Sequence, residues 1–224
     1  MIEIKRLAHS SILISTEAGN ICIDPYLSDS FPEEIMEFYR KPDKVDLLLI
    51  THGHHDHCDP SAFQGMLKED TEIIAPEICS DKIEREYKVI QAGDSIDIGE
   101  ILVGSVPAYN IKRKRESGEP FHPKGEGVGY LITVEGRTIY HLGDTENIPE
   151  IEGIEGVDLA FIPIDGTYTM DIDEAVKAAK KISPGIVIPI HEREADPLEF
   201  KSKLESKSDI EVRMLNEGEV TWLK

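Results

Sequence analysis

The sequence predicts an α/β chain in which two mixed β-sheets pack together with helices on the outside. Strand-like segments alternate with segments of helical pattern along the whole chain. The two halves also echo each other, because 20–24 and 137–141 have similar patterns and each precedes strand–polar turn–helix units. At 224 residues the chain can bury a full core, and no stretch has linker composition. We therefore expect one domain over residues 1–224.

The first half begins with strands rich in Ile and Leu, separated by turn residues at 18–20. The continuous apolar run at 47–50 is typical of a strand buried on both faces. Asp59 can cap a helix that begins at Pro60. The expected elements are strands over 7–15, 20–24, 47–50, 73–75, 96–98 and 101–106, a helix from 60, and a helix over 77–87.

The second half repeats this alternation. Glu135 and Gly136 are suited to the turn of a hairpin, and Asp171 with Glu174 has capping-box spacing ahead of an apolar helical face. Asp196 and Pro197 open another helix. The expected strands cover 127–134, 137–141, 159–164, 186–190, 210–215 and 220–223, and the helices begin at 171 and 196.

The chain is strongly acidic, with 44 Asp and Glu against 24 Lys and Arg and a net charge of −20. Such a surface repels polyanions on average, so we expect neither nucleic-acid nor anionic-membrane partners. No apolar run approaches the ~20 residues that span a bilayer, and no signal-peptide pattern is visible. The three cysteines form no C-x-x-C pair, so we expect a cytoplasmic protein.

The strongest chemical signal is a cluster of histidines directly after the buried strand 47–50. Its members are His52, His54, His55, Asp56 and His57. Imidazole and carboxylate groups in one loop are the ligand set of zinc, iron or manganese. Ligand sites in α/β sheets gather beyond the carboxyl ends of strands. His52 and His54 can converge on one ion, and Asp56 with His57 can reach a second.

With this cluster the sequence resembles the metallo-β-lactamase superfamily, whose defining pattern is H-x-H-x-D-H. Further matching elements are Ile23-Asp24-Pro25, Gly143-Asp144-Thr145 and Pro189-Ile190-His191. Segments 7–11, 107–110, 121–125 and 166–170 are similar to the ascorbate-6-phosphate-lactonase-like branch. The resemblance implies a four-layer αββα sandwich and a metal-dependent hydrolase.

The resemblance also implies roles for individual residues. His52 and His54 would hold one metal, Asp56, His57 and His191 a second, and Asp144 would bridge them. Asp56 and Asp144 would be the catalytic carboxylates. One or two divalent ions are expected, with zinc favoured over manganese or iron.

Three other residues are candidates for ligands or for supporting contacts. Asn110 occupies a slot in which relatives often have a third histidine, and an amide is a poor zinc ligand, so either the first site is weak or His122 fills it. For His9, support of a ligand and simple packing are equally favoured interpretations.

The dense basic run 112–115 lies between Asn110 and His122. A solvated hairpin tip is the simplest interpretation, and a lid that supplies positive charge to an anionic substrate is the functional one. The predicted substrate contacts are Lys112, Arg113, Lys124 and Tyr168.

The predicted function is hydrolysis, by a metal-bound hydroxide, of a small and anionic ester, lactone or phosphodiester. No G-x-S-x-G nucleophile motif is present. The alternatives are a nuclease of the same superfamily, an iron-dependent oxidoreductase and a non-catalytic metal-binding module. The chain could also form a homo-oligomer, although no apolar stripe identifies an interface.

Overall fold

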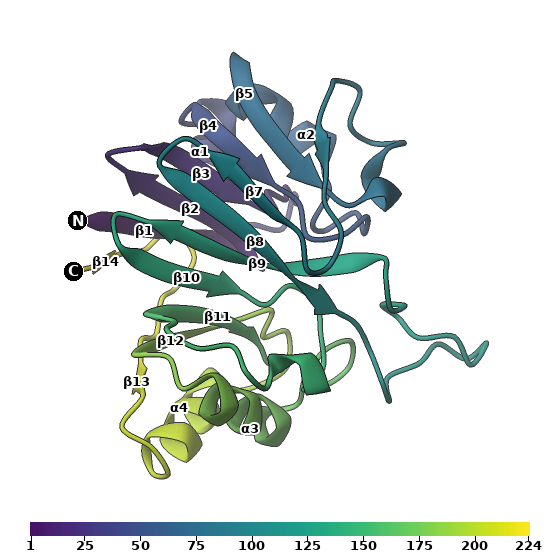
Figure 1. Ribbon diagram of the computed structural model, residues 1–224, viewed down its shortest axis with the longest axis vertical. Coiled ribbons are helices and arrows are strands. Elements are labelled where there is room, and N and C mark those ends of the chain that lie inside the picture. Colours follow the sequence, from purple (N-terminus) through teal and green to yellow (C-terminus); the bar gives the residue numbers. More distant parts are fainter. The chain divides into compact units, whose positions relative to one another are not determined.

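The computed structural model describes residues 1–224 and forms two compact units. One unit comprises Met1–Ile90 and Leu215–Lys224, and the other comprises Gln91–Met214. Each unit contains one seven-stranded mixed sheet. The predicted pair of mixed sheets with flanking helices is therefore confirmed (Figure 1).

The sheet of the first unit has the strand order β14-β1-β2-β3-β4-β5-β6. β4 lies between β3 and β5 and runs parallel to both, so the loop that follows it leaves from a carboxyl edge of the sheet. The elements are β1 (Ile2–Ala8), β2 (Ser11–Thr16), β3 (Gly19–Ile23), α1 (Glu33–Arg40), β4 (Val45–Leu49), α2 (Pro60–Phe63), η1 (Gln64–Met66), β5 (Leu67–Ala75), η2 (Glu77–Cys79), β6 (Lys88–Val89) and β14 (Val220–Leu223).

The sheet of the second unit has the order β13-β12-β11-β10-β9-β8-β7. The chain between β8 and β9 extends away from the sheet as a long loop (Figure 1). The elements are β7 (Ser95–Ile98), β8 (Ile101–Ala108), β9 (Gly127–Val134), β10 (Arg137–His141), η3 (Pro149–Ile151), β11 (Leu159–Pro163), α3 (Ile172–Ile182), β12 (Ile186–Ile190), α4 (Pro197–Glu205) and β13 (Glu211–Val212).

The two sheets repeat one topology. In each, two antiparallel pairings are followed by three parallel ones, along β1 to β6 and along β8 to β13. β3 corresponds to β10, the two segments whose sequences echo each other. The internal repeat that the sequence suggests is thus present in the strand connections.

Helices α3 and α4 lie together beside the second sheet (Figure 1). Asp171 caps α3 with a complete capping box, so the start of this helix is as predicted. Its buried face packs into one apolar cluster with residues of β11, β12 and α4. A separate cluster forms the core of the first unit around Leu48, Ile50 and Phe63.

Three secondary-structure expectations differ from the structure, and one helix was missed. The strand predicted over 7–15 is two strands, because His9 has a left-handed backbone (φ 53°) and turns the chain between β1 and β2. Helix α1 was not predicted. The predicted strand over 210–215 is only the two-residue β13, because Arg213 makes one further backbone bond, to Val187, and the chain then turns at Asn216–Glu219.

The helix predicted over 77–87 is wrong. Only the 3₁₀ turn Glu77–Cys79 forms. Cys79 and Ile83 are the only buried side chains in this stretch. The Arg85 guanidinium instead binds the carbonyls of Lys68 and Glu69.

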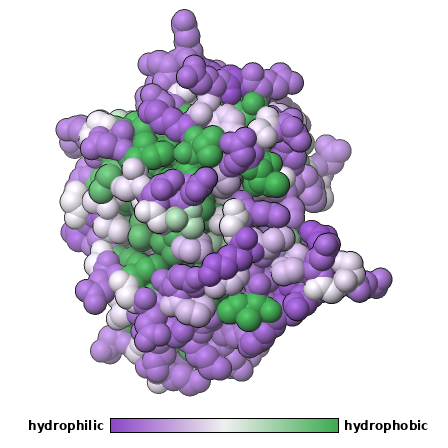
Figure 2. All heavy atoms as spheres, turned by 45° about the vertical axis from the view of Figure 1, so that its right-hand side comes forward, coloured by the Kyte–Doolittle hydropathy of each residue, from purple (hydrophilic) through white to green (hydrophobic).

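Hydrophilic residues make up most of the face in Figure 2, in keeping with a chain that is 30% charged. None of the helices combines the length and the apolar character that a membrane span requires.

Candidate metal centre

The histidine-rich loop of the first unit leaves the carboxyl end of β4. The amides of His57 and Cys58 both donate to the His54 carbonyl, at 3.2 and 2.8 Å, which curls the loop into a tight turn. His52 Nε2 lies 3.0 Å from His54 Nδ1. The rings of His52 and His57 are also adjacent, with centroids 4.1 Å apart. The structure therefore brings three predicted ligands of this unit together.

Asp24 stabilises this loop through contacts with Thr51 and His57. It follows β3 in a left-handed conformation (φ 47°) and is fully buried. Its carboxylate accepts hydrogen bonds from the Thr51 amide at 2.7 Å and the Thr51 hydroxyl at 2.6 Å. The same carboxylate lies 2.8 Å from His57 Nδ1. A carboxylate can only accept, so Nδ1 carries the proton and Nε2 keeps the lone pair that a metal needs.

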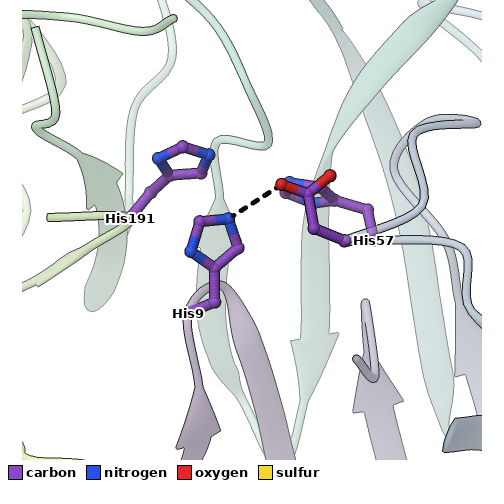
Figure 3. Close-up of side chains that lie close together, drawn as sticks. His9, His57 and His191 are labelled. Carbon is purple, nitrogen blue, oxygen red and sulfur yellow. Dashed lines mark ion pairs between the residues drawn. The ribbon is translucent and has the colours of Figure 1, made fainter. Parts of the chain in front are cut away.

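His9 joins the same cluster from the turn between β1 and β2. Its Nε2 lies 3.5 Å from Asp56 Oδ2, the contact dashed in Figure 3, and its ring packs edge-on to His57. The ligand atoms of His9, Asp56 and His57 all lie within 4.8 Å of one another. The left-handed backbone of His9 stores strain of ~1–3 kcal/mol, which is typical of functional positions. His9 is thus placed as a ligand or as a support for Asp56.

The second unit contains its own cluster, made by three residues from separate loops. Asp144 follows β10, His191 follows β12 in a left-handed conformation (φ 51°), and His122 lies in the loop between β8 and β9. His122 Nε2 and His191 Nε2 each lie 3.2 Å from Asp144 Oδ2. All three side chains are buried. Two imidazole nitrogens that converge on one carboxylate oxygen form a set of donors suited to a cation.

Asp165 supports His191 as Asp24 supports His57. Asp165 Oδ2 lies 3.2 Å from His191 Nδ1, and Oδ1 accepts the amides of residues 167, 168 and 169. Burial raises the pKa of the Asp165 carboxyl, but the hydrogen bond and charge of His191 together with these amides outweigh it, so the pKa lies below its usual value. The ionised form is therefore favoured, and His191 Nε2 is directed toward Asp144.

Asn110 performs the corresponding task for His122. Asn110 Oδ1 lies 2.9 Å from His122 Nδ1 and also accepts the His122 amide at 2.8 Å. The amide nitrogen of Asn110 donates to the Tyr168 carbonyl at 2.8 Å, which fixes which end of the amide faces His122. His122 Nε2 is therefore the ring nitrogen that faces Asp144. The structure places His122, and not Asn110, beside Asp144.

Glu146 fixes the start of the loop that carries the basic run. Its carboxylate, which is buried, accepts the backbone amides of Ile111, Lys112 and Arg113, the shortest at 2.7 Å. Arg113 Nη1 lies 3.4 Å from the same carboxylate. These contacts fix the backbone of Lys112 and Arg113, the first two residues of the basic run.

The predicted substrate contacts of this loop are engaged in ion pairs. Lys112 and Arg113 each bind Glu174 at 2.6 Å. Lys124 binds Glu150 at 2.6 Å, a hydrogen bond that raises the pKa of this lysine. Tyr168 follows β11 and packs edge-on to Phe121, with ring centroids 4.8 Å apart. Whether these residues touch substrate stays a prediction.

Sequence reasoning assigned no role to Asp24, Asp165 or Glu146. Asp24 lies in the matched Ile23-Asp24-Pro25 element, so a signal for it existed. Asp165 follows the buried strand β11, which corresponds to β4 in the repeat, so its position after a buried strand was the only local signal for it. Glu146 had no local signal, because its role depends on a loop 33 to 35 residues earlier in the chain.

Comparison with known proteins agrees with this fold. A family model described as beta-lactamase superfamily domain matches residues 3–191. A crystal structure from Parabacteroides distasonis is 36% identical over 97% of this chain and 94% of its own, with a TM-score of 0.85. Igni18, described as a metallo hydrolase from Ignicoccus hospitalis, is 25% identical over 100% and 99%, with a TM-score of 0.81. The fold and the His/Asp donors define a metal-dependent hydrolase of the metallo-β-lactamase superfamily.

Curated relatives narrow this class. The UPF0173 metal-dependent hydrolase of Nanoarchaeum equitans is 34% identical over 97% of this chain and 98% of its own length. That of Ignicoccus hospitalis is 31% identical over 97% and 96%. The chain belongs to this family of metal-dependent hydrolases.

Proposed function

We propose that the protein hydrolyses a small, anionic ester, lactone or phosphodiester at a centre of two divalent metal ions, zinc being the first candidate. The observation that carries this proposal is the repeated arrangement of donor and support. Asp24 lies 2.8 Å from His57 Nδ1 in one unit, Asp165 lies 3.2 Å from His191 Nδ1 in the other, and in both cases Nε2 is the proposed ligand atom. Residues that only pack a core do not need such matched tautomers.

The proposed ligands are divided by the order of the family pattern. His52, His54 and His122 would hold one ion, and Asp56, His57 and His191 would hold the other, with Asp144 serving both. His122 takes the third-histidine position in this scheme, since Asn110 is turned toward it as a hydrogen-bond partner. The donor set of imidazole and carboxylate fits zinc, manganese or iron.

Bound divalent ions would lower the pKa of a coordinated water to about 7 and polarise the group under attack. Asp56 and Asp144 are the carboxylates proposed to orient the attacking water and to take up its proton. His9 holds one oxygen of Asp56 at 3.5 Å and so limits its rotation. Because the nucleophile is water, no serine or cysteine is needed.

The proposed substrate is small and anionic. Several cationic side chains lie in the loops of the second unit that also carry His122 and His191, whereas the chain as a whole has a net charge of −20. Lys112, Arg113 and Lys124 are paired with Glu174 and Glu150, so the argument for a compact anion is that the acidic chain disfavours an anionic polymer. The lactonase-like resemblance of segments 107–110 and 121–125 supports the same class.

The test is turnover with restored metal. Chelator-stripped protein is reloaded with zinc, manganese or iron and assayed on carboxylate-bearing esters, lactones and bis(p-nitrophenyl) phosphate. We expect metal-dependent hydrolysis of at least one class, and an Asp56→Ala variant should lose it by about 10³-fold or more. The exposed Asp81 provides a matched control, Asp81→Ala, with unchanged turnover. Full activity of Asp56→Ala, or no metal-dependent turnover on the panel, would contradict the proposal.

A further inference from the structure

The cations of the second unit differ in whether a carboxylate neutralises them. Lys112 and Arg113 are paired with Glu174, and Lys124 with Glu150. Arg193 has no ion pair, and its guanidinium instead lies over the Tyr168 ring, 4.8 Å from the centroid. Its charge is therefore available to a ligand.

Arg193 is placed by the same turn that places His191. The two residues are separated by one position, and both have left-handed backbones, with φ of 49° and 51°. Such conformations cost ~1–2 kcal/mol for a non-glycine residue. Two of them within three residues after β12 fix where the chain leaves the strand and so place the backbone of Arg193 close to that of His191. The Arg193 side chain is exposed.

Tyr168 is in turn fixed by the residues around His122. Its ring packs against Phe121 with an interplanar angle of 78°, and Phe121 directly precedes His122. Its carbonyl accepts the Asn110 amide that orients the His122 ring. Phe121 and Tyr168 are therefore in contact and are here called the aromatic wall, and Arg193 lies over Tyr168. Each of the three residues is connected to a candidate metal-binding residue.

We propose that Arg193, held against Tyr168, binds the carboxylate of the substrate, while the aromatic wall packs against its planar or apolar part. A guanidinium presents a planar fork that matches a carboxylate with two parallel hydrogen bonds. Stacking on Tyr168 restricts the arginine before binding, so less side-chain entropy is lost when the ion pair forms. This inference rests on the proposed function, because it names the substrate class of the same site.

The experiment measures binding rather than turnover. Benzoate carries one carboxylate on one planar ring, so it is titrated by calorimetry into the zinc-loaded protein and into zinc-loaded Arg193→Gln. We expect saturable binding to the wild type and a Kd at least about tenfold higher in Arg193→Gln. Arg193→Lys keeps the charge but not the fork, so its Kd should fall between the two. Arg213→Gln, which removes the same charge from a residue paired with Glu211, serves as the control and should bind as the wild type does.

Each outcome decides the inference. Equal affinity of wild type and Arg193→Gln would overturn it, as would the absence of saturable benzoate binding to the wild type. Wild-type affinity in Arg193→Lys would overturn the two-bond contact. Failure of the proposed function is a separate result: it would leave the benzoate difference in place while no ester, lactone or phosphodiester is hydrolysed.

Discussion

Three histidines of the two clusters share one arrangement, in which a side-chain oxygen lies beside Nδ1 and Nε2 is the proposed ligand atom. Asp24, Asp165 and Asn110 supply the acceptor for His57, His191 and His122. The first two acceptors are carboxylates and the third is a neutral amide. Neutral support gives a less basic imidazole, so the ion that His122 helps to hold should be the more weakly bound of the two.

Removal of Asn110 should therefore weaken one metal ion. In Asn110→Ala the His122 ring loses the hydrogen bond that fixes its tautomer and its orientation. We expect zinc affinity at that site to fall about 10- to 100-fold. Asn110→Asp keeps an acceptor and should restore most of the affinity. Competition with a chromophoric chelator measures the zinc affinity of both variants. Asn216→Ala, in the turn 216–219 of the other unit, is the control. Unchanged affinity in Asn110→Ala would show that His122 is not a ligand.

The sequence identifies the donors at this scale better than their supports. His52, His54 and His57 are found because four histidines crowd one loop. Asp24 and Asp165 are single carboxylates after strands, and single carboxylates at such positions are usually caps. The matched Ile23-Asp24-Pro25 element marks Asp24 without giving its role, and for both residues the role follows from the distance to a histidine ring, which is a property of the folded chain.

At the scale of elements, the backbone of β9 lies very close to the backbone that follows β10. A Cβ added to Gly129 on β9 would lie 2.7 Å from the Leu142 carbonyl oxygen and 2.8 Å from that of His141. The loop after β10, which holds Asp144, therefore depends on a glycine in the neighbouring strand.

Gly129→Ala should be strongly destabilising. The added methyl has to displace backbone, which costs about 1–3 kcal/mol or more. Gly104 on β8 provides the comparison, because its added Cβ would make ordinary contact with Leu131 at 3.6 Å. Urea unfolding of metal-free protein should show a much lower midpoint for Gly129→Ala than for Gly104→Ala. Similar midpoints would contradict the close approach.

A charged network joins α3 to the loop between β8 and β9. Burial raises the pKa of the Glu174 carboxyl, but the hydrogen bonds from Lys112 and Arg113 together lower it by more. The pKa therefore lies below its usual value. A carboxyl with a lowered pKa in the folded state stabilises the fold above its unfolded pKa of about 4.3, and this contribution is lost as the pH falls.

Glu174→Gln should therefore cost stability in a pH-dependent way. We expect a loss of about 1 kcal/mol at pH 7 that persists to about pH 5 and shrinks as the pH falls below about 4.3. Denaturant unfolding of metal-free wild type and variant at several pH values measures the difference. Glu84→Gln, at an exposed position, should show little change. A difference that stays constant with pH would mean that the charge of Glu174 is not responsible.

Elements with strong local signals are the ones that the sequence predicts well. The capping box of α3 and the buried strands β4, β11 and β12 match the structure. The expected helix over 77–87 and the unpredicted α1 show the limit. Each has few buried side chains, so helical pattern alone did not decide which of them forms.

At the scale of the whole molecule, a repeated topology places the donors at corresponding strand ends. Asp24 and Asp144 follow β3 and β10, which are the same strand of the repeat, while the histidine loop and Asp165 follow β4 and β11. The sequence predicts this architecture from two weakly similar halves. Each unit by itself supplies only part of the proposed coordination, so the central claim is that the donors of both units bind the same ions.

Metal content of single and double variants tests this claim most directly. His57 belongs to one unit and His191 to the other, and both are proposed ligands of the same ion. His57→Ala, His191→Ala and the double variant are purified without added ions, and metal per chain is measured by mass spectrometry beside the wild type. We predict about two equivalents in the wild type, and a loss of about one in each single variant and the same one in the double variant. A double variant that loses about twice as much as either single variant would contradict a shared ion.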